Sequence, residues 1–191
     1  MFTTSTGKPG TSCAAPPAKW ARAPRSCRRV HPAASTREPT LDNEEDPPLS
    51  WRQTRELFAA DHARLRRALA AQLGAEPALT WLHPGAACVF LFRVAHHLWR
   101  RGHRKSARLV SQLGTLATGG DFHPASAFGP GLLVPHPTGV ALMGGAGRNL
   151  AVMSRSGTGM LPKSRDAGVG MGLPFLGDDC TIGPCCGIEG P

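Results

Sequence analysis

Two short motifs in the second half of the chain contain residue types that can do acid–base chemistry. The first is residues 121–124, DFHP, and the second is residues 135–140, PHPTGV. They place Asp121 and His136 fifteen positions apart. A neutral imidazole can remove a proton from a hydroxyl group, and a carboxylate can orient that imidazole and stabilise its cationic form. These motifs are the first candidates for a reactive site.

A third candidate lies in the glycine-rich residues 157–166, GTGMLPKSRD, where Lys163 and Arg165 are the cations. Such backbone and side chains can approach phosphates or a carboxylate. A solvated surface loop is the alternative. No spacing of histidine and cysteine supports a metal site. We expect His96, His97 and His103 to be core or surface residues of a helical region rather than ligands.

A six-residue hydrophobic period begins after Gly120 and predicts the element that positions the two motifs. Its members are Phe128, Val134, Val140, Ala146 and Val152, followed after an interruption by Leu176, Ile182 and Ile188. This period indicates a hexapeptide β-helix, in which each short strand places one side chain in a narrow core. A glycine- and proline-rich loop region that matches the period by accident is the alternative.

Three helices are predicted ahead of the β-helix. Ser50 and Gln53 form a capping box for the first, which Gly74 can end. Pro84 opens the second, which Gly102 closes, and the third runs from about Arg104 to Thr118. We therefore divide the chain into a disordered basic tail (1–48), an α-helical region (49–118) and a β-helix domain (119–191).

The formal net charge of +9 is concentrated in parts of the chain. The region before Glu38 has seven Lys or Arg residues and no acid. It is expected to be a disordered extension, and an organellar transit peptide over residues 1–37 is the alternative. A nucleic-acid or membrane-surface binder is a further alternative, but no aromatic residues interleave with the basic ones as a base-stacking surface requires.

Cysteine usage and hydropathy favour a cytoplasmic protein. The six cysteines show no CxxC spacing, so a disulfide framework or structural zinc is not expected. The apolar stretch of residues 86–98 is too short for a transmembrane helix and contains Arg93 and His96. We expect no membrane insertion and no nucleic-acid partner.

Taken together, the motifs resemble the serine acetyltransferase family. The resemblance rests on residues 121–125 (DFHPA), 128–131 (FGPG) and 135–140 (PHPTGV), and on the upstream residues 93–102 (RVAHHLWRRG). It covers roughly residues 85–191. Its most specific element is D-x-H-P followed at fixed spacing by H-x-T-G-V.

The resemblance implies a left-handed parallel β-helix, here of about three incomplete coils, that assembles as homotrimers or dimers of trimers with active sites between subunits. It implies acetyl transfer from acetyl-CoA, a co-substrate, to the hydroxyl of L-serine in cysteine biosynthesis, without a metal. His136 matches the general base and Asp121 its carboxylate partner. Attack is then direct, with no covalent acyl-enzyme. Lys163 and Arg165 are the candidates for binding CoA phosphates, and His123 is interpreted as structural.

Three departures from the family pattern keep alternatives open. Pro135 stands where an aspartate normally precedes the base and helps to hold the amino acid, and the loop of residues 154–174 has no histidine. The acceptor is therefore L-serine or another hydroxyl compound such as a sugar. The chain also stops at Pro191 in mid-coil, which predicts a C-terminally truncated β-helix. A non-catalytic or degenerate trimeric scaffold is the alternative to an enzyme.

Overall fold

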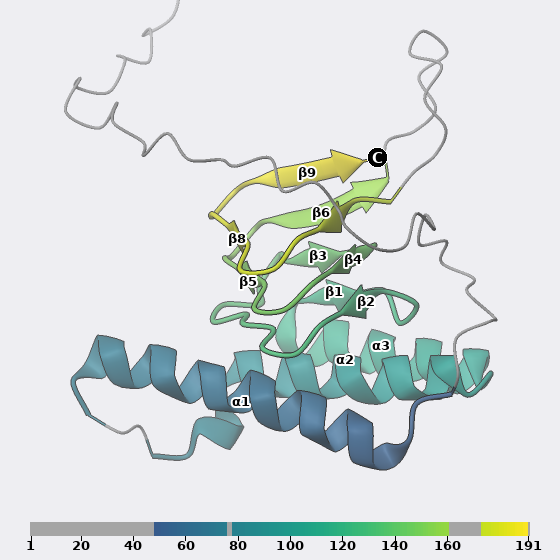
Figure 1. The fold of residues 1–191 in the computed structure, drawn as a ribbon, viewed down its shortest axis with the longest axis horizontal. Helices are drawn as coiled ribbons and strands as arrows, with labels where there is room; N and C mark the ends of the chain where they lie inside the picture. The colour runs from purple at the N-terminus through teal and green to yellow at the C-terminus, as the bar shows by residue number, and fades with distance from the viewer. Residues whose placement is uncertain (1–47, 76–77, 161–172, 191) are drawn as a thin grey trace, which may run out of the picture. The chain divides into compact units, whose positions relative to one another are not determined.

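Three helices lie beneath a stack of short strands in the computed structural model of the chain (Figure 1). The structure describes residues 48–75, 78–160 and 173–190. All of these belong to one unit, Glu38–Pro191. The predicted tail up to residue 47, and both Lys163 and Arg165, lie outside the described residues.

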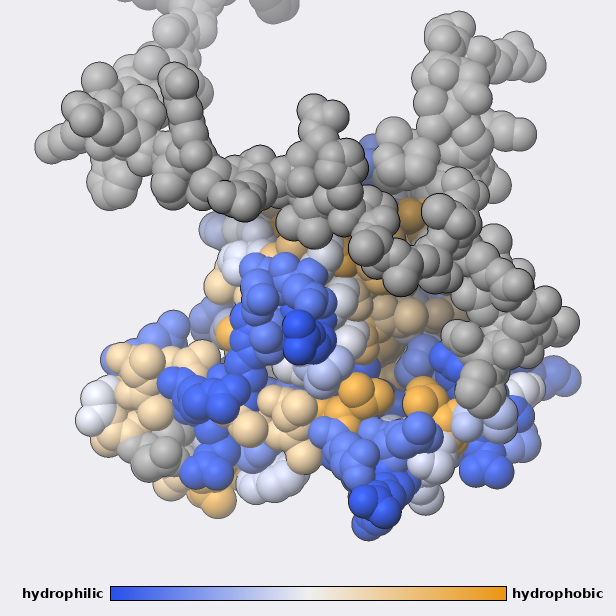
Figure 2. All heavy atoms as spheres, in the orientation of Figure 1, coloured by the Kyte–Doolittle hydropathy of each residue, from blue (hydrophilic) through white to orange (hydrophobic). Residues whose placement is uncertain are grey.

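The helices begin and end where local sequence signals predict. Helix α1 (Trp51–Leu73) has the predicted capping box between Ser50 and Gln53, and Gly74 ends it with a φ of 69°. A single 3₁₀ turn, η2 (Thr80–Leu82), follows. Helix α2 spans Pro84–Arg100 and helix α3 spans Arg104–Thr118. In Figure 2, the face that contains α1 shows hydrophilic patches separated by paler apolar residues, as expected for an amphipathic surface helix.

Nine short strands follow the helices in the described part of the chain. They are β1 (Asp121–Phe122), β2 (Ala127–Phe128), β3 (Ala141–Leu142), β4 (Gly145–Ala146), β5 (Ala151–Val152), β6 (Gly157–Met160), β7 (Phe175–Leu176), β8 (Thr181–Ile182) and β9 (Gly187–Gly190). They form three sheets with the orders β1-β3-β6-β9, β2-β4-β7 and β5-β8. All pairs are parallel, and Leu133 bridges to Ala151 beside β5. Three parallel sheets visited in turn make a three-sided β-helix.

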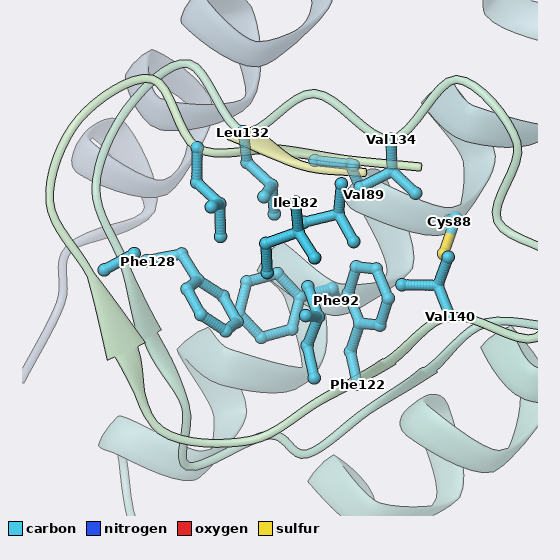
Figure 3. Packing of buried hydrophobic residues seen from close by; sticks show 13 residues of the cluster. Cys88, Val89, Phe92, Phe122, Phe128, Leu132, Val134, Val140 and Ile182 are labelled. Atoms are coloured by element: carbon cyan, nitrogen blue, oxygen red, sulfur yellow. The ribbon is translucent and has the colours of Figure 1, made fainter. Parts of the chain in front are cut away.

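The six-residue period corresponds to the core of this β-helix. Phe128, Val134, Val140, Ala146, Val152 and Ile182 are all buried, and Leu176 and Ile188 are partly buried against them. The labelled side chains from the different sides of the coil point toward one another in Figure 3, and Cys88, Val89 and Phe92 join them from α2. The predicted core is thus confirmed for the described residues, and α2 closes its base.

One corner of the coil repeats a left-handed backbone conformation on successive levels. Gly131, Asn149 and Asp179 have φ angles of 85°, 60° and 57°. The Asn149 side-chain amide donates to the Asp179 carboxylate at 2.8 Å, which joins two levels of the column. Glycine and asparagine are among the residues that adopt this conformation at low cost.

Polar side chains of the helices cover the open edge of the first coil. Strands β1 and β2 each form an edge of their sheets in the described part of the chain. Uncovered strand edges leave backbone groups without partners. Here, side chains of the three helices donate hydrogen bonds to five backbone carbonyl groups of the first coil. The carbonyls, each with its donor, are Phe122 (Ser111 Oγ, 2.8 Å), Pro124 (His96 Nδ1, 2.9 Å), Phe128 and Gly129 (Arg93, 2.6 and 2.7 Å) and Gly131 (Arg64).

His96 is a neutral member of this set. Burial lowers the pKa of its imidazole to about 4, against a smaller opposing effect of the hydrogen bond to Pro124. Because the Pro124 carbonyl can only accept, Nδ1 must hold the ring proton. The imidazole is therefore a structural donor, as the sequence predicted for a histidine of the helical region.

A buried ion pair between α1 and α2 makes several of the hydrogen bonds at this edge. Arg93 donates to both carboxylate oxygens of Asp61, at 2.8 and 3.2 Å, and the two side chains are only 1% and 2% exposed. One oxygen of Asp61 also accepts from the backbone N–H groups of Gly131 and Leu132, at 2.8 and 2.7 Å. With the two carbonyls that Arg93 reaches, the pair satisfies four backbone groups of the first coil.

Helix α3 packs through small residues rather than through its leucines. Ala107, Ser111 and Gly114 are its buried residues. Leu113 and Leu116 are 51% and 83% exposed. The small residues allow α3 to approach α2 closely, and a Cβ on Gly114 would lie 3.5 Å from Leu91.

Val140→Asp is expected to unfold the β-helix. Val140 is 1% exposed, and burial of a valine contributes about 1.5–3 kcal/mol. The substitution removes that term and also buries a carboxylate without a partner. Circular dichroism during heating should show a lost or strongly lowered transition. Leu116→Asp is the matched control, since its exposed side chain predicts little change; equal effects of the two substitutions would contradict a core position for Val140.

Candidate active site

His136 lies on an exposed corner of the first coil whose backbone is firmly held. Its neighbours Pro135 and Pro137 are both buried, while the histidine itself is exposed. Upstream, Leu133 N donates to Leu150 O at 2.9 Å, and downstream, Val140 N donates to Pro137 O at 2.9 Å. The imidazole therefore projects from a rigid segment into solvent, where a substrate can reach it.

Asp121 lies on the neighbouring segment. It is the first residue of β1, it is exposed, and its N–H donates to Val140 O at 2.8 Å. Just before these two residues in their segments, Gly139 N donates to Gly119 O at 2.9 Å. The residues around Asp121 and those that follow His136 thus run alongside each other. Among the described residues no hydrogen bond or ion pair joins Asp121 to His136, so their action as a pair stays a prediction.

Glycine makes this close approach possible. A Cβ on Gly120 would lie 2.8 Å from Cys88 Sγ and 3.3 Å from Pro137 Cβ. A larger residue would push the segment that leads to Asp121 away from the corner that holds His136. The double glycine that ends α3 therefore also shapes the candidate site.

His83 is a residue near this site that the sequence did not single out. It is the N-cap of α2, and its Nδ1 accepts from Gly85 N at 3.1 Å. Partial burial lowers the pKa of His83, and the charge of His136 lowers it further. Pro84 marks the start of α2, which identifies His83 as a cap. Its position beside His136 depends on how α2 packs against the first coil, and no local sequence pattern predicts that packing.

A groove of about 330 Å³ begins at Gly139, which follows His136 by three residues. It crosses the outer side of the sheet β3-β6-β9, where Ala141, Gly157 and Gly187 lie in register. Arg155, whose N–H donates to Thr138 O at 3.2 Å, is a cation in its wall. Its lining residues are Gly139, Ala141, Arg155–Gly159 and Cys185–Glu189. The volume of the groove and the small residues of its floor suit an extended ligand chain.

Two further findings concern metals and membranes. Within residues 48–75, 78–160 and 173–190, no three His, Cys, Asp or Glu side chains gather in a way that could hold a metal ion. In the same ranges, no helix has the length and apolar character that crossing a bilayer requires.

Comparisons with known proteins agree with this architecture. No family model matches the chain. The chain is 32% identical over 114 residues to a serine acetyltransferase of Mycobacterium tuberculosis. This alignment covers 57% of the chain and 47% of that protein. A serine acetyltransferase of Helicobacter pylori is 38% identical over 61 residues, 32% of this chain and 36% of that one. The chain thus spans about half or less of the length of these relatives.

Solved structures show the same fold. The serine acetyltransferase of Neisseria gonorrhoeae superposes with a TM-score of 0.61 at 22% identity, over 71% of this chain and 51% of that one. Isoform 3 of Entamoeba histolytica, solved in complex with cysteine, gives a TM-score of 0.59 at 23% identity, over 73% and 49%.

The fold that the chain shares with these solved structures is a helical block followed by stacked parallel strands. In sequence and in fold, the chain is thus similar to serine acetyltransferases.

Proposed function

We propose that the protein is a serine O-acetyltransferase, which converts acetyl-CoA and L-serine to O-acetyl-L-serine and CoA. One observation carries the proposal: in a chain similar to serine acetyltransferases, His136 is held on an exposed corner beside the segment of Asp121 and next to a groove. Cysteine biosynthesis is the pathway that this reaction serves. A cytoplasmic location is part of the proposal, since the four cysteines in the described residues are free.

The proposed reaction begins with His136 as a neutral base. Its imidazole takes the proton of the acceptor hydroxyl while that oxygen attacks the thioester carbonyl. The Asp121 carboxylate stabilises the imidazolium that forms. Collapse of the tetrahedral intermediate breaks the carbon–sulfur bond, and the imidazolium returns its proton to the CoA thiolate. No bond forms between the acetyl group and the protein.

The groove on the sheet β3-β6-β9 is the proposed place for the chain of acetyl-CoA. Its floor of Ala141, Gly157 and Gly187 allows an extended thiol arm to lie against the backbone. Lys163 and Arg165 remain the proposed partners of the phosphates, and Arg155 adds a cation at the groove itself. No metal has a role in this proposal.

Left-handed winding and trimeric assembly complete the proposal, with residues 49–118 as the helical region and 119–191 as the β-helix domain. A homotrimer or a dimer of trimers would place the active site between subunits. Exposed apolar side chains such as Phe175, which is 60% exposed, support self-association.

We expect light scattering at micromolar concentration to give the mass of a trimer or a hexamer. A short β-helix exposes apolar flanks that association can bury. Phe175→Ser should shift the distribution toward smaller species, whereas the control Arg52→Ser, at an exposed i,i+4 ion pair on α1, should not. A monodisperse wild-type monomer would contradict an intersubunit site.

A thiol-release assay tests the proposed activity. Purified protein is mixed with acetyl-CoA and, in turn, L-serine, other hydroxyl amino acids and sugars, and the appearance of free CoA is followed. The proposal expects the fastest release with L-serine. A sugar as the best acceptor would support the second candidate, which Pro135 favours because this buried residue offers no polar side chain to an amino acid. No release with any acceptor would favour the non-catalytic scaffold.

A further inference from the structure

We propose that His83 is a substrate-binding residue, whose Nε2–H donates a hydrogen bond to the carboxylate of the amino-acid acceptor while the acceptor hydroxyl lies at His136. This inference rests on the proposed function. It names the group that recognises the acid end of the substrate and leaves the chemical step to His136.

Contact between backbones holds His83 at the site. Gly85, in the first turn of α2, packs so tightly on the strand before His136 that a Cβ there would lie 2.1 Å from Val134 O. Val134 is 1% exposed and precedes His136 by two residues. The start of α2 and the corner that holds His136 therefore cannot move apart without losing this contact.

The cap also selects the tautomer of His83. Nδ1 accepts the N–H of Gly85 at 3.1 Å, so it has no proton of its own. In the neutral ring the proton must then be on Nε2, at the opposite edge from the helix. Partial burial and the nearby charge of His136 both lower the pKa of His83, which favours this neutral form. His83 as a whole is half-buried, and in the described part of the chain its ring has a hydrogen bond at Nδ1 and none at Nε2, which leaves Nε2 for a ligand.

The two residues that flank His136 offer a carboxylate no hydrogen-bond donor. Pro135 and Pro137, on either side of the base, have no side-chain donor and are buried. Asp121, on the adjacent segment, is an anion when charged and would repel a carboxylate rather than bind it. His83 is a neutral donor that the fold brings to the same corner from a different element.

The test compares two acceptors in two matched variants. His83→Asn keeps a strong N-cap residue and so preserves α2 while removing the imidazole. His103→Asn is the control, because His103 is the exposed N-cap of α3 and makes no side-chain cap bond. L-serine and ethanolamine both have a hydroxyl and an amine, but only L-serine has a carboxylate. Steady-state kcat and KM are measured for each acceptor at saturating acetyl-CoA, and circular dichroism confirms folding.

His83→Asn should raise KM for L-serine about tenfold to a hundredfold, the range for loss of a hydrogen bond to a charged group. It should change kcat little, and kcat/KM for ethanolamine by less than about twofold. His103→Asn should behave as the wild type. Equal losses for both acceptors, or an unchanged KM for L-serine, would overturn the assignment of His83 while leaving the enzyme a serine acetyltransferase. A wild type that transfers no acetyl group to L-serine would overturn the proposed function, and this inference with it.

Discussion

Replacing His136 by alanine is expected to lower the rate of acetyl transfer by about 10²–10⁴-fold, the usual contribution of a positioned general base. A hydroxyl group is a poor nucleophile at neutral pH, and nothing else on the corner between Pro135 and Pro137 can accept its proton. Stopped-flow or steady-state assays with saturating substrates measure this loss. Acetyl-CoA should still bind with nearly unchanged affinity in calorimetry, because the imidazole acts on the acceptor.

Asp121→Asn supplies the second half of this prediction. An amide cannot stabilise the imidazolium and favours a different ring tautomer, so the rate should fall as in other His–Asp pairs. The double variant should lose little more than His136→Ala alone, because the two residues act as a unit. Losses that simply multiply would show that Asp121 works independently of His136, for example by supporting the β1 segment.

Breaking the buried ion pair should cause a large loss of stability. Arg93→Met leaves the Asp61 carboxylate buried without its partner and removes the donors to Phe128 O and Gly129 O. Removal of one partner from a buried pair typically costs about 3–5 kcal/mol. The free energy of unfolding from urea titration measures this loss.

Arg148→Met is the matched control for that experiment. Arg148 also pairs with an aspartate, Asp178, at 2.9 Å, but these side chains are 68% and 45% exposed. Exposed pairs contribute about 0–1 kcal/mol. Similar losses in the two variants would mean that burial and the bonds to the first coil add nothing to the pair at Arg93.

Much of this fold can be predicted from the sequence, because its signals are local. The capping box at Ser50, Pro84 at the start of α2 and the double glycine after Thr118 each act within a few residues of the helix end they define. The six-residue period succeeds for a related reason. Each coil repeats the same environment at the same spacing. The positions of Val134, Val140 and Val152 therefore predict the core even when the pairing of the strands is not known.

The remaining features depend on how distant elements pack. Asp61 and Arg93 read as ordinary polar residues of two helices, and only the structure brings them together under the backbone of Gly131 and Leu132. His83 reads as a helix cap, and its position at His136 follows from the contact of Gly85 with Val134. Leu116 has an apolar side chain, but it is exposed because small residues form the inner side of α3.

Product analysis tests the central claim most directly. Wild-type protein and His136→Ala are incubated with acetyl-CoA and L-serine, and O-acetyl-L-serine is identified by mass spectrometry. The account predicts that the wild type forms this ester and that His136→Ala, although folded by circular dichroism and able to bind acetyl-CoA, forms it at least about a hundredfold more slowly. Ester formation by His136→Ala at the wild-type rate, or none by the wild type, would contradict it.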